Sequence, residues 1–191
     1  KQYYNLKTSQ SIKKSISTTR SFGKETNNYN IIKEAINNFA SNCALKLRKE
    51  NICCSKLTVF LMTNTYKTNT KQHYPKITLL FSTATNDSLE ISNMANKALK
   101  IIYNNNCAYK KAGVIVHKTT PDKEIQISLF NEINRKKRRK LMHSLDSINM
   151  MMGKDKVRLA SQGFEEKWQK KQEQLSPCYT TQIEDILTIK I

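Results

Sequence analysis

The sequence lacks the long apolar runs, clustered glycines and paired cysteines on which several classes of protein depend. No apolar run approaches the ~20 residues that cross a bilayer, and residues 1–20 contain no hydrophobic core of a signal peptide. The four glycines lie in separate parts of the chain, so they cannot form a Walker A loop or a G-x-G-x-x-G turn. The five cysteines include no C-x-x-C pair, as expected of reduced thiols in a cytosol. We therefore expect a cytoplasmic protein with no membrane contact.

Acidic residues are also scarce, with 15 Asp and Glu against 33 Lys and Arg. They are scattered, and none precedes Glu25. Metal-dependent polymerases and nucleases hold Mg²⁺ between two or more carboxylates, so we expect no catalytic residue and no cofactor in this chain. A histidine beside Cys53 or Cys54 would make a nucleophilic pair. A small cysteine-dependent enzyme, inactivated by thiol alkylation, is one alternative.

The net charge of +18 is typical of a protein that binds a polyanion, because each Lys or Arg that neutralises a phosphate releases counterions. Part of this charge reflects a composition rich in Lys, Asn and Ile. The run Arg135–Lys140 is more informative, because arginine is rare elsewhere in the chain. It is either a solvated loop or a contact for nucleic acid or an acidic partner.

Hydrophobic periodicity predicts the order strand, helix, strand, strand, helix, strand. A capping pair, Asp87 and Glu90, is expected to begin the second helix. This order predicts an α+β fold, in which a four-stranded antiparallel sheet carries both helices on one face and leaves the other open. The predicted ranges are 16–22, 31–50, 57–62, 77–81, 87–105 and 112–116.

Beyond residue 118 the pattern changes. A helix closed by Gly153 is predicted around Leu141–Met151, and a second helix over Phe164–Leu175. Between the sheet and these helices, Gln126–Phe130 places two large apolar side chains in a polar segment. It is either a peptide anchor that enters a partner's pocket or an ordinary strand or core segment.

Several ordered motifs resemble the C-terminal part of the UmuC-type Y-family translesion DNA polymerases, the family of the DNA polymerase V catalytic subunit. Arg20–Gly23 resembles the S-R-S-F-G that opens the family's little-finger domain, and Tyr109–Val114 resembles its closing strand. Gln126–Phe130 stands where the family has its sliding-clamp motif. Thr19 and Ile127 are mild departures from these patterns. The UmuC-specific tail is resembled by Gln162, Gly163, Trp168, Lys170, Leu175–Pro177 and Tyr179–Thr181.

The resemblance implies a linker over residues 1–14, a little-finger DNA-binding domain over 15–118, a clamp-binding arm over 119–134 and a UmuC-type tail over 135–191. It implies error-prone translesion synthesis in SOS DNA repair and mutagenesis. The implied partners are DNA, the sliding clamp, the processed UmuD dimer and the RecA filament. The family's palm, with its Mg²⁺-binding carboxylates, and its fingers and thumb are absent, so we expect no DNA polymerisation by this chain. Because the sequence begins with Lys1, it is expected to be a piece of a longer protein.

We expect duplex DNA to lie along the open sheet face and the loop over residues 63–76, held through its phosphates. The alternative is a free-standing basic RNA-binding or ribosome-associated protein, which would display aromatic residues on the open face for base stacking. The candidate strands offer mainly Lys, Thr and Ser. The expected DNA-binding residues are Arg20, Ser21, Lys67, Lys71, Lys76, Lys110 and Lys111, and the expected clamp-binding residues are Gln126, Leu129 and Phe130.

Overall fold

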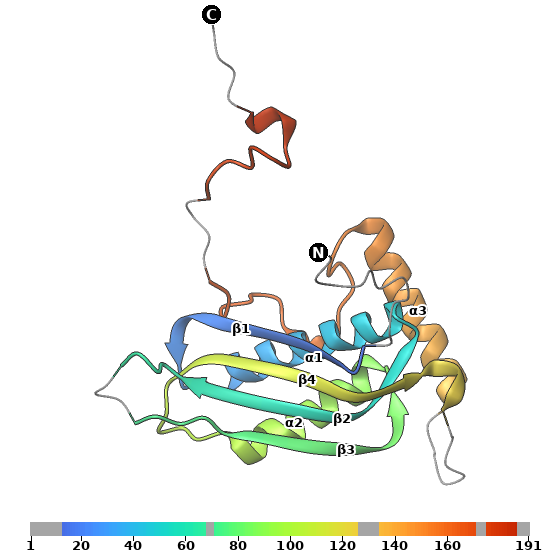
Figure 1. Ribbon diagram of the computed structural model, residues 1–191, viewed down its shortest axis with the longest axis horizontal. Coiled ribbons are helices and arrows are strands. Elements are labelled where there is room, and N and C mark those ends of the chain that lie inside the picture. The colour runs from blue at the N-terminus through green and yellow to red at the C-terminus, as the bar shows by residue number, and fades with distance from the viewer. Residues whose placement is uncertain (1–12, 68–70, 126–133, 171–174, 187–191) are drawn as a thin grey trace, which may run out of the picture.

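The computed structural model describes residues 13–67, 71–125, 134–170 and 175–186. A four-stranded sheet carries two helices against one face, and a third helix stands at one end of the sheet (Figure 1). In chain order the strands and α-helices are β1 Ser15–Thr26, α1 Tyr29–Lys49, β2 Ile52–Thr63, β3 Lys76–Thr85, α2 Ser88–Ile102, β4 Tyr109–Pro121 and α3 Arg135–Met152. Short 3-10 helices span Asp122–Glu124, Ala160–Gln162 and Ile183–Asp185.

The sheet has the order β1-β4-β2-β3, and all neighbouring strands run antiparallel. The predicted α+β fold and its β-α-β-β-α-β order are therefore confirmed. Alternate side chains of each strand point to the helices and form the core with them. The remaining side chains form the face that is turned toward the viewer in Figure 1.

The two covering helices begin at side-chain caps. Asn28 accepts hydrogen bonds from the backbone N–H groups of Asn30 and Ile31 at the start of α1. Asp87 accepts one from Leu89 at the start of α2, as predicted, but the Asp87 N–H donates to the Thr85 hydroxyl and not to Glu90, its predicted capping partner. No helix in the described part of the chain is long and apolar enough to cross a membrane. Ile32, Ile36, Phe39, Cys43 and Leu47 recur at spacings of three and four, so they share one face of α1, and all five are buried in the core.

Every strand is longer than its side-chain pattern predicted. β1 continues through Gly23 to Thr26, although Gly23 was expected to end it. β2 begins at Ile52, whose Cα pairs with that of Pro121 at the end of β4. The backbone ladder sets these lengths, and it does not require alternation of polar and apolar residues. As a result Thr119–Pro121, expected in a flexible arm, belong to the sheet.

The run Arg135–Lys140 forms the first turns of α3, so the alternative of a solvated loop is wrong. Asn134 caps this helix by accepting a hydrogen bond from the backbone N–H of Lys137. Met142 is buried, and Asp146 receives two hydrogen bonds from Arg48 of α1, at 2.6 and 2.8 Å. These contacts fix α3 against the end of the helical layer.

After α3 the chain turns back and packs on α1. Asn149 of α3 exchanges two hydrogen bonds with the backbone of Val157, at 2.7 and 2.8 Å. Further along, Gly163 has a φ of +65° and lies so close to the Glu34 side chain that an added Cβ would be 2.4 Å from its Cδ. This segment therefore follows the surface of α1 closely.

The helix predicted over Phe164–Leu175 is wrong for the residues that the structure describes. Residues 163–170 form bends and turns, and Trp168 packs edge-on against Phe39 with ring centroids 5.1 Å apart. The Trp168 carbonyl accepts a hydrogen bond from the Gly23 N–H of β1. Tertiary contacts with α1 and β1 thus hold an irregular segment in place.

Candidate nucleic-acid interface

The open face of the sheet brings together part of the predicted DNA-binding set. Lys111 of β4 lies opposite Ser21 of β1 on one side and Met62 of β2 on the other. Lys76 of β3 lies opposite Phe60 of β2. Phe60 is two residues from Met62 along β2, so Lys76 and Lys111 are on the same face of the sheet. Two ammonium groups and a serine hydroxyl from three strands therefore share this face.

A third lysine on the same face, Lys56 of β2, was not predicted. Its Cα pairs with that of His117 on β4 and with that of Leu80 on β3. The prediction began β2 at residue 57 and so left this lysine outside the strand. The alternation of Lys56 with Thr58 and Phe60 would have placed it on the open face.

Hydroxyl and imidazole groups connect the strands beside Lys56. The Thr58 hydroxyl lies 2.7 Å from the Thr78 hydroxyl and 3.1 Å from Nε2 of His117. These groups come from β2, β3 and β4. They add further hydrogen-bonding groups beside the lysines.

The open face also carries aromatic side chains, which the sequence analysis did not expect. Phe60 lies over Gly113, where an added Cβ would be 2.5 Å from the Phe60 ring. The ring is only 7% exposed, and Tyr74 packs edge-on against it at 5.8 Å. Tyr74 itself is 57% exposed. Phe60 is therefore a packing residue, because its ring is not accessible to a stacked base.

Two predicted residues do not belong to the open face. Arg20 of β1 lies opposite Ala112 of β4. Side chains alternate along β1, so Arg20 is on the helix-covered side of the sheet with Ile16 and Thr18. Arg20 is still exposed, because β1 is an edge strand. Lys110 donates hydrogen bonds to the carbonyls of Phe22 and Gly23, at 2.9 and 3.3 Å. Its ammonium group joins β4 to β1.

The loop between β2 and β3 is held by an acidic residue of β1. Glu25 accepts a hydrogen bond from Asn64 at 2.8 Å and pairs with Lys67 at 3.0 Å. Hydrogen bonds from Asn64 and then from Lys67 lower the pKa of Glu25 below its ordinary value of 4.5. Lys67 therefore has an intramolecular partner and is less available to phosphate than predicted.

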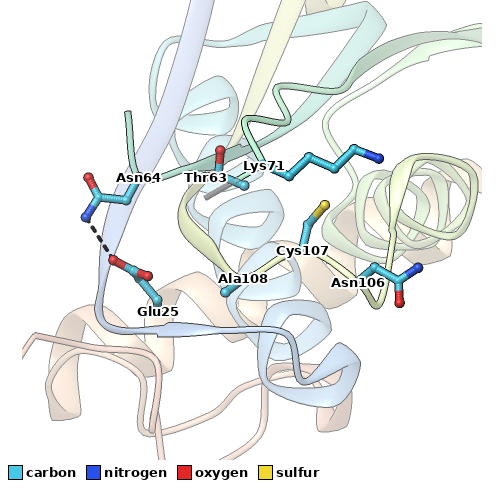
Figure 2. Close-up of a pocket in the computed structure, with 7 residues that line it drawn as sticks. All are labelled: Glu25, Thr63, Asn64, Lys71, Asn106, Cys107 and Ala108. Atoms are coloured by element: carbon cyan, nitrogen blue, oxygen red, sulfur yellow. Dashed lines mark hydrogen bonds between the residues drawn. The ribbon is translucent and has the colours of Figure 1, made fainter. Parts of the chain in front are cut away.

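Lys71, the other predicted residue of this loop, lines a small pocket at the same end of the sheet (Figure 2). The pocket has a volume of about 230 Å³, below the ~300–1,000 Å³ of usual small-molecule sites. Figure 2 shows Asn64 pointing to the carboxylate of Glu25 at its rim. The pocket is lined by Glu25, Thr63, Asn64, Lys71, Asn106, Cys107 and Ala108.

Cys53 and Cys54, the two cysteines considered as nucleophiles, are both buried. Burial raises the pKa of Cys53 to about 12 and that of Cys54 to about 12. Both thiols therefore remain protonated at neutral pH, which removes the thiolate that a cysteine-dependent enzyme requires. Among the residues that the structure describes, no three His, Cys, Asp or Glu side chains gather in a group that could hold a metal ion.

The predicted clamp-binding segment cannot be placed. Gln126, Leu129 and Phe130 lie outside the described residues. Before them, the chain leaves β4 through the 3-10 helix Asp122–Glu124. Asp122 is held by an ion pair with Arg139 of α3. The start of the expected arm is therefore anchored to the folded body.

Comparison with known proteins assigns the chain to a family. The model of the impB/mucB/samB family C-terminal domain matches residues 13–129, more than half of the sequence. The chain belongs to the impB/mucB/samB family. A second domain, of unknown function (DUF4113), matches residues 139–189. The impB/mucB/samB match covers the whole sheet, both covering helices and the residues that follow β4.

Individual members of the impB/mucB/samB family align with nearly all of this chain. Protein UmuC of Salmonella typhimurium LT2 is 34% identical over 179 residues, which are 93% of this chain and 42% of that protein. Protein ImpB of Salmonella typhimurium is 35% identical over 175 residues, 91% of this chain and 41% of that protein. The chain thus spans about two fifths of the length of these relatives. The resemblance to the C-terminal part of UmuC-type proteins is confirmed.

Among solved structures, a Y-family DNA polymerase chimera, Dbh-Dpo4(243-245)-Dbh, is similar to this impB/mucB/samB domain with a TM-score of 0.44. The sequence identity is 12%, and the match covers 62% of this chain and 32% of the chimera.

Proposed function

We propose that the chain is the DNA-binding and sliding-clamp-tethering C-terminal portion of an error-prone translesion DNA polymerase that acts in SOS repair and mutagenesis. Membership of the impB/mucB/samB family supports this role. The observation that carries it is the open sheet face, where Lys56, Lys76 and Lys111 come from three strands. These ammonium groups lie on one face, where they can contact the phosphates of a duplex.

The chemistry of the face favours phosphate contact over base recognition. Ammonium groups and hydroxyls bind phosphate oxygens without regard to sequence. The Phe60 ring is buried and does not offer the stacking surface that RNA-binding sheets use. Tyr74 is exposed, so RNA binding is tested alongside DNA binding.

A triple variant tests the sheet face: Lys56→Gln, Lys76→Gln, Lys111→Gln. Its affinity for a labelled DNA duplex is measured by fluorescence anisotropy at salt concentrations from 50 to 200 mM. Each lost phosphate contact should reduce the slope of log K against log salt by about 0.9. A matched control, Lys33→Gln, Lys97→Gln, Lys100→Gln, removes the same charge from the helical layer. Equal losses in both variants would show that only net charge matters. Tighter binding of single-stranded RNA, lost in Tyr74→Ala, would favour the alternative.

We propose that Gln126, Leu129 and Phe130 bind the hydrophobic cleft of the sliding clamp. Each buried large apolar side chain contributes about 1.5–3 kcal/mol, so Leu129→Ala with Phe130→Ala should weaken clamp binding by at least ~100-fold. Lys123→Ala is the nearby control. The thermal melt of the double variant should be unchanged. A collapsed melt would instead assign both side chains to the core.

We propose that the end of the tail contacts the processed UmuD dimer and the RecA filament. Residues 175–186 follow the segment that packs on α1, and they carry exposed apolar side chains. Those side chains are Leu175, Tyr179, Ile183 and Ile186. Deletion of residues 175–191 should abolish pull-down of both partners and leave the melt unchanged. Undiminished pull-down would contradict this role.

We propose that this chain has no nucleotidyl transfer activity of its own and that catalysis belongs to the rest of the protein. Mg²⁺-dependent primer extension by the purified 191-residue chain, free of contaminating polymerase, would contradict this.

A further inference from the structure

The basic run at the start of α3 separates its arginines from its lysines. A helix turns by about 100° per residue, so Arg135, Arg138 and Arg139 fall within an arc of about 100°. The three lysines fall within a second arc of about 100° on the opposite side. They are Lys136, Lys137 and Lys140.

The arginine side holds the helix to the body. Arg135 pairs with Glu90 of α2 at 3.6 Å, and Arg138 pairs with Asp87 at 3.3 Å. Arg139 pairs with Asp122, which follows β4. Guanidinium groups suit such contacts because their planar donors match carboxylates. The arginines are therefore used within the molecule.

The lysine side faces solvent. Lys136, Lys137 and Lys140 are all exposed. Within the described part of the chain, no carboxylate lies within 4.0 Å of their ammonium groups. Three positive charges on one helical face repel one another unless an anion lies between them. The cost of this arrangement suggests a role in binding.

The position of α3 puts these lysines beyond one end of the open sheet face. Figure 1 shows α3 at the end of the sheet where β3 and β4 finish. On the open face, Lys111 and Lys76 lie toward the opposite end, and Lys56 lies nearer to α3. Positive charge on the open face thus continues along the strands toward the end of the sheet at which α3 begins.

We propose that Lys136, Lys137 and Lys140 form a second contact for the phosphate backbone of the duplex DNA that lies on the sheet. This inference rests on the proposed function and extends its footprint beyond the little finger. Single-stranded DNA fits less well, because its sites usually interleave aromatic side chains and α3 contains no Phe, Tyr or Trp. The lysines act as point charges on phosphate and carry no sequence preference.

The test measures the affinity of three variants for a 24-base-pair duplex and its dependence on salt. The α3 variant carries Lys136→Gln, Lys137→Gln and Lys140→Gln. It is compared with the sheet variant and with the helical-layer control. We expect the α3 variant to reduce affinity by about tenfold and the salt slope by about 2–3. The three corresponding Lys→Arg changes should retain the slope, because charge is kept. The control should change affinity by less than about threefold, as a long-range effect of net charge.

The outcomes separate this inference from the proposed function. Loss in the sheet variant alone would overturn the α3 contact and leave the proposed function intact. Loss in neither variant would overturn both. Loss in the α3 variant alone would remove the sheet face from the DNA site, and it would overturn both the proposed site and the role of α3 as its second contact.

A second measurement does not depend on variant folding. Lysine acetylation of the unmodified chain, read by mass spectrometry, should be slowed by duplex at Lys136, Lys137 and Lys140. Acetylation of Lys33, Lys97 and Lys100 should be unaffected. Equal rates with and without duplex at the α3 lysines would overturn the proposal.

Discussion

Asn38 of α1 and Gln162 of the C-terminal segment join parts of the chain that are 124 residues apart. The Asn38 amide donates to the Gln162 carbonyl at 2.6 Å, and the Gln162 amide donates back to the Asn38 side chain at 3.2 Å. Both residues are buried. The pair therefore satisfies polar groups that water cannot reach, and it makes the segment after α3 part of the domain.

Gln162→Ala should lower the free energy of unfolding by about 1–3 kcal/mol, because it removes the side-chain donor to Asn38 Oδ1 and leaves that buried oxygen without this hydrogen bond. Urea denaturation measures the effect. Ser161→Ala, at the exposed neighbouring position, is the control and should change stability by less than about 0.5 kcal/mol. Equal midpoints for the two variants would show that the segment is not docked in solution.

Trp168→Ala should destabilise the chain by about 3–5 kcal/mol, because the ring is 8% exposed and packs against Phe39. Trp168 is the chain's one tryptophan, so its fluorescence reports directly on docking of this segment. The native emission should be blue-shifted and should shift to red in the same transition as the loss of circular dichroism. Phe164→Ala, at an exposed ring, should leave the transition in place. An earlier fluorescence change would mean that the segment detaches before the sheet unfolds.

Gly113→Ala should cost about 1–3 kcal/mol, since the added methyl group would collide with the Phe60 ring. The same change in a Phe60→Ala background should cost less. A double-mutant cycle on thermal or urea unfolding measures this coupling, which should be at least about 0.5 kcal/mol. Additive effects would show that the ring does not rest on Gly113.

The lowered pKa of Glu25 predicts a specific acid sensitivity. A carboxyl group whose pKa is lower in the folded state stabilises the fold above its unfolded pKa, near 4.5, and this contribution is lost as pH falls through the folded pKa. Glu25→Gln should therefore be less stable than the wild type at pH 7, and the difference should shrink below about pH 4.5. Urea midpoints from pH 3 to 7 measure it. Glu124→Gln, which removes an exposed carboxylate outside this loop, is the control.

The sequence by itself determined the order of the elements and the buried face of α1. Residues at spacings of three and four must share one side of a helix, and Asp87 satisfies donors that lie two residues away. These are local effects, so one sequence is enough to predict them. The ordered set of motifs, from Arg20–Gly23 to Tyr179–Thr181, was likewise sufficient to indicate the family that the comparison confirmed.

Only the tertiary structure decided which basic side chains remain available. Lys110 and Lys67 have the same charge as Lys111 and Lys76, but both have partners in β1. Backbone carbonyls of β1 accept hydrogen bonds from Lys110, and the Glu25 carboxylate pairs with Lys67. Strand pairing also added Lys56 to the open face. Such partners are distant in sequence, and no local pattern encodes them. For the same reason Trp168 forms part of an irregular, docked segment, because contacts with Phe39 and Gly23 outweigh the local preference for helix.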